Sequence, residues 1–181
     1  MRIKNIKVWF VDLQNTKPYT IAFKTTDLVL NAFVEITLDN GVTGIGSGNP
    51  SEYVTGEHFD QTKDALQEKN LEFLIGRDIR EANQLFFEIL QKFPEHPAAR
   101  AALDIAIYDA LTKYLDIPLV KFLGQKIKSL PTSNTIGIKN VADTLKEAKE
   151  YDQRGFKILK VKLGIDPEED IERMVKLREE F

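Results

Sequence analysis

The chain has 181 residues, of which 43% are hydrophobic and 29% charged, and its formal net charge at pH 7 is -3. This composition is that of an ordinary globular protein and differs from those of disordered, collagen-like and membrane-spanning chains. The slight negative charge and the scattered lysines argue against nucleic-acid binding, which needs a concentrated basic surface. The chain has no cysteine, which excludes disulfides, thiolate metal sites and a cysteine nucleophile.

The first ten residues, MRIKNIKVWF, alternate in polarity and lack the continuous apolar run of a secretion signal. No apolar run approaches the length of about 18 residues that indicates a membrane-spanning helix. These features predict a cytoplasmic protein that binds neither membrane nor nucleic acid.

Three strands are expected in the first 48 residues. Alternating apolar residues predict a half-buried strand around residues 6–10 and a second strand over residues 32–38. Asp39-Asn40-Gly41 supplies a hairpin turn, because Asn and Gly accept the positive φ that the turn needs. A third strand over residues 42–48 completes an antiparallel meander.

Two loops and four helices complete this part of the chain. Residues 13–28 contain Pro18 and lack a clear period, so we expect a long loop there, and a second loop over residues 48–57. A helix is expected from Asp78, with Glu81 placed to complete a capping box. Its core face is expected to carry Ala82, Leu85, Phe86, Ile89 and Phe93. The other helices are expected over residues 57–74, 98–114 and 118–124.

The pattern changes near Ser129, where strands and helices begin to alternate. The segment TSNTIGI predicts a strand, the helix after it begins at Asn140, FKILKVKL predicts a second strand, and Asp166 begins the last helix. Such alternation is typical of βα units with a parallel sheet. An α+β region over residues 1–128 is therefore expected to precede two βα units over residues 129–181.

The strand within GFKILKVKLG, residues 155–164, is expected to have two different faces. One face carries Leu159, Val161 and Leu163, and the other carries Ile158, Lys160 and Lys162. Taken alone, a Lys-x-Lys pattern is most often a solvated face. However, a parallel strand between helices is usually covered on both faces. In a barrel, the face opposite the helices is the interior, and active sites form at the carboxyl ends of the strands.

This position makes Lys160 and Lys162 candidate catalytic residues. Two partly desolvated ammonium groups about 7 Å apart disfavour each other's charge. A lysine brought toward neutrality can act as a general base, and its charged neighbour can stabilise a developing oxyanion. The pair is therefore suited to removing a proton next to a carboxylate.

The order of these segments resembles that of the enolase superfamily, in its muconate-lactonizing (mandelate racemase-like) branch, and most closely the dipeptide epimerases. The resemblance covers essentially the whole chain: the meander with its loops TKPYTIAFKTT and NPSEYVTGE, the helical segment AARAALDIAIYDALTKYLDIPLVKFLG, TSNTIGI and GFKILKVKLG. It implies an α+β capping domain, an antiparallel meander plus helices over residues 1–128, whose loops close over the mouth of a (β/α)8 barrel. The first two βα units of that barrel would be residues 129–181, so the barrel is incomplete.

The resemblance also implies roles for individual residues. Lys162 would be the acid/base on one face of the α-carbon, and Lys160 would lie against the substrate carboxylate and the enolate. Thr135 matches a family position that contacts substrate. Lys24 stands where members acting on Ala-Glu have an arginine, and a lysine lacks the bidentate fork that grips a carboxylate.

The metal of the family has no expected ligands in this chain. The resemblance implies Mg²⁺ held by acidic residues on the third, fourth and fifth barrel strands, with an opposing lysine on the sixth. None of these strands is present in the 181 residues, and without the metal the enolate loses most of its stabilisation. We therefore predict no turnover by this chain alone. It would need the remainder of the barrel or a homo-oligomer to act on a small-molecule carboxylate such as a dipeptide.

Two further functions stay open at this point. Muconate cycloisomerase and o-succinylbenzoate synthase chemistry would use the same Lys-x-Lys strand. A non-catalytic remnant, in which the capping domain and two βα units pair with another chain, belongs to a different class.

Other motifs are weaker candidates. GIGSGN, residues 44–49, does not have the spacing of a phosphate-binding loop, so close backbone packing or loop flexibility is expected. Asp104 and Asp109, five apart, do not share a helix face well. His58 and His96 lack partners at metal-ligand spacing and are expected at the surface. Tyr53 and Thr55 in the second loop could contact substrate or be purely structural.

Overall fold

The computed structural model describes residues 1–22 and 24–181. It divides into two compact units, the first comprising Met1–Leu13 and Val29–Lys126 and the second comprising Gln14–Leu28 and Ile127–Phe181. A domain boundary after residue 128 stays a prediction.

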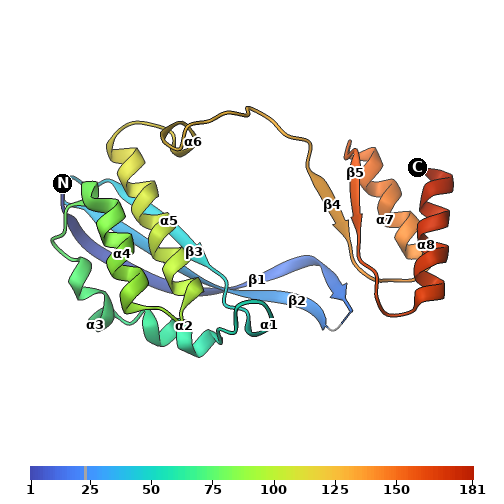
Figure 1. The fold of residues 1–181 in the computed structure, drawn as a ribbon, viewed down its shortest axis with the longest axis horizontal. Helices are drawn as coiled ribbons and strands as arrows, with labels where there is room; N and C mark the ends of the chain where they lie inside the picture. The colour runs from blue at the N-terminus through green and yellow to red at the C-terminus, as the bar shows by residue number, and fades with distance from the viewer. Residues whose placement is uncertain (23) are drawn as a thin grey trace. The chain divides into compact units, whose positions relative to one another are not determined.

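The first unit is built on an antiparallel meander, as predicted (Figure 1). Its strands are β1 (Ile3–Ile21), β2 (Lys24–Leu38) and β3 (Thr43–Gly48), in the order β1-β2-β3. The alternating residues of β2 point into the core and are fully buried: Ala32, Val34, Ile36 and Leu38. Gly41 adopts a φ of 87°, as the predicted turn between β2 and β3 requires.

The predicted loop over residues 13–28 is wrong, because β1 and β2 continue through this segment as a long hairpin. Phe23 lies outside the described residues. Pro18 is compatible with β1 because β1 is an edge strand of the sheet, where alternate residues have no ladder hydrogen bond to lose. The segment is rich in threonine, which favours strands, but most of its side chains are exposed, so no apolar period marks it. We call residues 14–22 and 24–28 the hairpin tip.

The second predicted loop contains one helical turn, α1 (Glu52–Thr55). The single helix predicted over residues 57–74 is wrong. The structure has α2 (Phe59–Ala65), α3 (Glu68–Leu71) and a 3₁₀ turn at Glu72–Leu74. The break follows from side-chain competition for the backbone, since the Asn70 amide donates to the Asp64 carbonyl at 2.8 Å.

The next helix begins with a 3₁₀ turn, Ile79–Glu81, and continues as α4 (Ala82–Lys92). Asp78 accepts from the Arg80 N–H at 3.0 Å, as an N-terminal cap should. The predicted capping box is not formed by Glu81, whose carboxylate instead accepts from the Arg77 guanidinium at 3.2 Å. Glu81 stands at the third helical position after Asp78, where a capping box needs it, but Arg77 binds its carboxylate instead.

The remaining helices of this unit follow the prediction. They are α5 (Pro97–Tyr114) and the short α6 (Leu119–Phe122). Figure 1 shows α4 and α5 on one face of the meander. Among the residues that the structure describes, no helix is long and apolar enough to cross a bilayer.

Close backbone packing explains the glycines of GIGSGN. A Cβ atom added to Gly44, Gly46 or Gly48 would lie 2.0–2.3 Å from backbone atoms of α5. The facing positions on α5 are alanines: Ala98, Ala102, Ala106 and Ala110. Strand β3 therefore lies directly on the helix backbone, which confirms the packing interpretation of this motif.

The second unit contains the two βα units that the sequence predicts. Strand β4 (Ser133–Ile136) pairs in parallel with β5 (Ile158–Val161), and α7 (Val141–Gln153) and α8 (Pro167–Glu180) follow them. The caps form as expected, at Asn140 and Asp166. A small core joins one face of the sheet to both helices, through Ile136, Leu159, Val161, Ala148, Tyr151 and Leu177.

Candidate active site

The predicted lysine pair lies on the face of the β4–β5 sheet that α7 and α8 leave open. Thr135 on β4 is the register partner of Lys160 on β5, so the two residues share a face. Lys162 follows β5 directly and donates its backbone N–H to the Ile136 carbonyl at 3.0 Å. Its position two residues after Lys160 carries it to the same side. The structure thus brings Lys160, Lys162 and Thr135 together, with Lys160 exposed and the other two half-buried.

A buried ion pair that the sequence pattern did not predict fixes the chain just after Lys162. Asp170 on α8 accepts the Gly164 N–H at 2.7 Å and pairs with Arg173. The Arg173 side chain is completely buried, and its Nη1 donates to the Lys139 carbonyl at 3.0 Å. This connection joins the segment after β5 to the segment after β4. An Asp-x-x-Arg spacing on one helix face was the available signal.

The hairpin tip, which contains Lys24, lies at the carboxyl ends of β4 and β5. The Thr20 carbonyl accepts the Ile138 N–H at 2.9 Å, just beyond β4. A Cβ atom built on Gly164, beyond β5, would be 3.5 Å from the Ala22 Cβ. Lys24 is exposed and begins β2 in this tip. The described geometry therefore brings its segment to the same end of the sheet as the lysine pair.

Tyr53 and Thr55 belong to the first unit and lie in α1. The Thr55 hydroxyl donates to the Ser51 carbonyl at 3.0 Å, which closes this helical turn. The Tyr53 ring is largely exposed. Their contact with substrate stays a prediction.

Glu147 on α7 is the centre of a charged cluster in the second unit. Its carboxylate pairs with Lys139 and accepts from the Tyr151 hydroxyl at 2.6 Å. Burial works to raise the pKa of Glu147, but the hydrogen bonds from Lys139 and Tyr151 outweigh it and hold the pKa below its ordinary value. Glu147 is therefore an anion at neutral pH although it is buried.

Replacing Tyr151 by phenylalanine is expected to change how stability depends on pH. Burial and the hydrogen bond to Glu147 raise the pKa of Tyr151 to about 12. The folded state thus keeps this proton more tightly than the unfolded state. The stabilisation is complete below about pH 10 and is lost as pH rises through about 12. In urea unfolding, the stability difference between wild type and Tyr151→Phe should shrink across this window; a constant difference would contradict the prediction.

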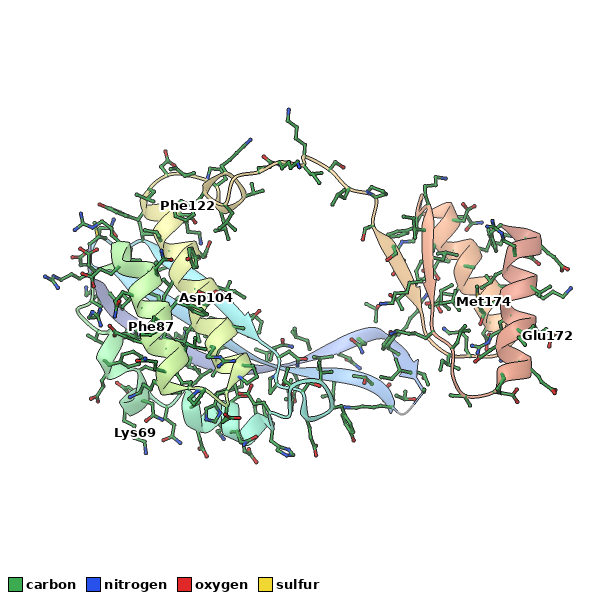
Figure 2. The ribbon with its side chains drawn as sticks, viewed as in Figure 1. Lys69, Phe87, Asp104, Phe122, Glu172 and Met174 are labelled. Atoms are coloured by element: carbon green, nitrogen blue, oxygen red, sulfur yellow. The ribbon has the colours of Figure 1, made fainter. Side chains whose placement is uncertain are left out.

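The aspartates of α5 do not form a carboxylate pair. Asp109 accepts from the Ile45 N–H at 2.8 Å and from Lys113 at 2.7 Å, so it ties α5 to β3. Asp104 lies elsewhere on the helix (Figure 2), where burial raises its pKa.

The two histidines differ from each other. His58 is exposed, as predicted, and begins α2. The surface prediction for His96 is only partly right: its side chain is half-buried, and its Nδ1 is buried 3.9 Å from Glu57, which is itself buried. Glu57 accepts the Ala98 N–H at 2.6 Å. A carboxylate at the N-terminus of α5 is favourable, because the helix dipole stabilises negative charge there.

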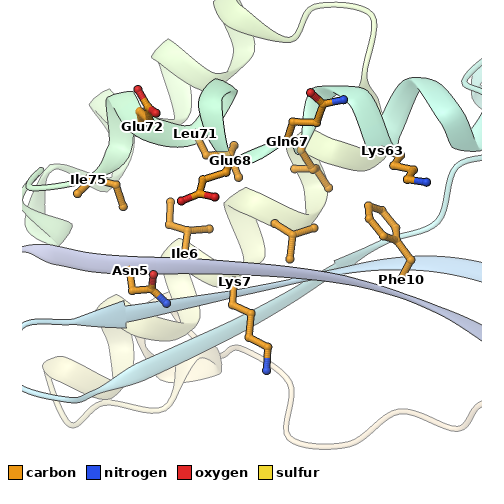
Figure 3. Close-up of a pocket in the computed structure, with 12 residues that line it drawn as sticks. Asn5, Ile6, Lys7, Phe10, Lys63, Gln67, Glu68, Leu71, Glu72 and Ile75 are labelled. Atoms are coloured by element: carbon orange, nitrogen blue, oxygen red, sulfur yellow. The ribbon is translucent and has the colours of Figure 1, made fainter.

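A groove of about 550 Å³ lies between β1 and the α2–α3 segment of the first unit. Figure 3 shows Ile6 and Phe10 pointing toward the helices and Lys7 pointing away. Glu68 and Glu72 line its other side. None of the predicted site residues lines this groove.

Metal ligands do not gather in the part of the chain that the structure describes. No three His, Asp or Glu side chains there lie close enough to hold an ion. These residues therefore do not fit a magnesium site by themselves, and we derive no chemical step through a metal.

The fold, with Lys160 and Lys162 at the end of β5, is that of an α+β domain followed by βα units. Comparison with known proteins gives the family. Residues 5–124 match the N-terminal domain of the mandelate racemase / muconate lactonizing enzyme family. The chain belongs to this family.

Its curated relatives include two L-Lys-D/L-Arg epimerases. The protein of Desulforapulum autotrophicum is 50% identical over 100% of this chain, and that of Methylococcus capsulatus is 45% identical over 99%. The chain spans about half the length of these relatives, 51% and 50% respectively.

Solved structures agree with this placement. The Methylococcus capsulatus dipeptide epimerase complexed with Mg and L-Arg-D-Lys matches with a TM-score of 0.96, over 99% of this chain and 51% of that one. The Enterococcus faecalis V583 dipeptide epimerase complexed with Mg and L-Leu-L-Tyr is 32% identical. It matches with a TM-score of 0.90, over 99% of this chain and 50% of that one.

Proposed function

We propose that this chain is the N-terminal part of a dipeptide epimerase. The observation that carries the proposal is the position of Lys160, Lys162 and Thr135 on the open face of β4–β5. The match to dipeptide epimerases over nearly the whole chain supports it. The relatives are about twice as long as the matched region. The opposite-face acid and the magnesium ligands would therefore come from outside these 181 residues, in the remainder of the barrel.

The lysines have distinct roles in this proposal. Lys162 Nζ accepts the proton from the α-carbon of one dipeptide residue, leaving an enolate. The ammonium of Lys160 pairs with the enolate oxygen, where the negative charge develops. Thr135, opposite Lys160 in the sheet register, would contact the same end of the substrate. An acid on the other face then returns a proton to the α-carbon and inverts it.

We further propose that the substrates are dipeptides with basic side chains. The two L-Lys-D/L-Arg epimerases among the relatives support this specificity. Lys24 at the hairpin tip lacks the bidentate fork with which an arginine binds a carboxylate, so it would hold an acidic side chain less firmly.

Deuterium incorporation from D₂O tests this function directly. The complete protein that contains this chain, with Mg²⁺, should incorporate deuterium at one α-carbon of L-Lys-L-Arg or L-Arg-L-Lys and produce the epimer. L-Ala-L-Glu and L-Leu-L-Tyr are the comparison substrates. We expect kcat/KM for the basic dipeptides to be at least about tenfold higher, the gain from one charge-assisted contact.

Each outcome has a clear meaning. Turnover with a preference for L-Ala-L-Glu would reject the basic specificity but keep the epimerase. Absence of exchange with every dipeptide would reject the epimerase and favour cycloisomerase or synthase chemistry, or a non-catalytic protein.

A further inference from the structure

One side chain of the hairpin tip faces three residues of α7. Lys17 Nζ donates to Glu150 Oε2 at 2.6 Å and lies 4.0 Å from Glu147 Oε1. It also lies 5.7 Å from the centre of the Tyr151 ring. Positions 147, 150 and 151 share one face of a helix. Lys17 is therefore directed at a surface with two carboxylates and an aromatic ring.

The backbone next to Lys17 is also attached to the second unit. The Thr20 carbonyl accepts the Ile138 N–H at 2.9 Å. A Cβ atom on Gly137 would lie 3.0 Å from the Thr20 carbonyl oxygen and 3.1 Å from its nitrogen. A larger residue at Gly137 would have to push the tip away. The tip is thus docked by a backbone hydrogen bond, a close glycine contact and an ion pair.

The strength of the Lys17–Glu150 ion pair depends on solvent and salt. The side chains of Lys17 and Glu150 are 48% and 45% exposed, so solvent screens their attraction. Glu147, in contrast, is buried and kept anionic by Lys139 and Tyr151. It offers Lys17 a second, fixed charge. The hydrogen bond from Lys17 lowers the pKa of Glu150, which keeps that carboxylate charged near neutral pH as well.

We propose that Lys17 is a positioning residue: it holds the hairpin tip against α7, and this docking sets the affinity for substrate. The second part rests on the proposed function. The Thr20 and Thr25 hydroxyls are 3.0 Å apart and join the two strands of the tip next to Lys24. Holding Lys17 therefore holds the segment of Lys24 at the carboxyl ends of β4 and β5.

The proposal predicts an effect on binding and not on chemistry. Lys17 faces α7 and does not lie on the open face of Lys160 and Lys162. A residue that only places a wall of the site stabilises the bound substrate and the transition state equally, which changes KM and leaves kcat unchanged.

Hydrogen exchange tests the docking without any need for turnover. In the complete protein, Lys17→Met removes the charge and keeps a long side chain. Amides of the hairpin tip should exchange about three- to fivefold faster, the effect of losing one exposed ion pair. Lys17→Arg should keep the wild-type rates. Lys4→Met, which removes another exposed lysine of β1, is the matched control and should leave the tip unchanged.

Steady-state kinetics test the consequence for substrate. Lys17→Met and Glu150→Gln should each raise KM about three- to fivefold with kcat within about twofold. The double variant should be no worse than Lys17→Met alone, because that substitution already removes every interaction of the Lys17 ammonium with α7. Raising the salt concentration should bring the KM of wild type toward that of Lys17→Met, because salt screens an exposed pair.

The outcomes separate the two proposals. Unchanged exchange in Lys17→Met would reject the docking role. Faster exchange with unchanged KM would reject the effect on substrate affinity. A fall in kcat equal to the change in kcat/KM would place Lys17 in the chemistry and contradict a positioning role. If wild type turns over no dipeptide, the proposed function fails, and the exchange measurement still decides whether Lys17 holds the tip.

Discussion

Replacing Lys162 by alanine in the complete protein is expected to lower kcat/KM for epimerisation by about 10³-fold or more. Loss of a positioned general acid/base costs about 10²- to 10⁴-fold, and the proposed epimerisation would need Lys162 in either direction. Lys162 follows β5 on the open face of the sheet, and its backbone hydrogen bond to Ile136 does not involve the side chain. The variant should therefore keep the fold and lose the reaction.

The exchange pattern of this variant is more informative than its rate. If a second base serves the other face, that base can still remove the α-proton of the opposite epimer. Lys162→Ala should then exchange the α-proton of one epimer and not of the other. Lys157→Ala, an exposed lysine just before β5, is the matched control and should retain wild-type kinetics. Equal loss of exchange from both epimers would instead indicate that Lys162 supports the site as a whole.

The arrangement of the lysines could be predicted because it depends on local geometry. Two residues that are two apart in a strand point the same way, whatever the rest of the fold. The buried face of β2, the turn at Gly41 and the two βα units followed from the same kind of reasoning. These features are specified by neighbouring residues, so the sequence pattern is sufficient.

The extended hairpin could not be predicted in the same way. Its outer part has little apolar alternation, and its attachments come from distant residues. Lys17 and its partner Glu150 are 133 positions apart in the chain. The Arg173 contact to the Lys139 carbonyl spans 34 positions. Hydrophobic periodicity carries no information about such distant pairs. These contacts nevertheless help to position the segment of Lys24 and the end of β5.

The helix break after Ala65 has a different cause. The apolar spacing over residues 57–74 fits a continuous helix, but the side chains of Gln67 and Asn70 both bind to Asp64. Local side-chain hydrogen bonds of this kind compete with the helical ladder. A pattern of apolar residues cannot show which of the two prevails.

Replacing Gly46 by alanine is expected to destabilise the protein by about 3 kcal/mol or more, at the upper end of the cost of overpacking. An added Cβ would lie 2.0 Å from the Ala102 carbonyl oxygen and 2.6 Å from the Ala106 nitrogen. Glycine to alanine in an unstrained position usually stabilises by about 0.4–1 kcal/mol through the unfolded state. At Gly46 the steric clash destabilises the folded state by more than this gain. Urea unfolding of wild type and Gly46→Ala measures the net change in the free energy of unfolding.

Two further variants identify the cause of the effect. Ser47→Ala, one residue along β3 on the other face, should change stability by less than about 0.5 kcal/mol. Ala102→Gly should not rescue Gly46→Ala, because the obstacle is the helix backbone and not the Ala102 methyl group. Rescue by Ala102→Gly would show that side chains set the spacing. Absence of rescue would show that the α5 backbone itself sets the distance between β3 and α5. Only glycine on β3 then lets the strand lie directly on the helix.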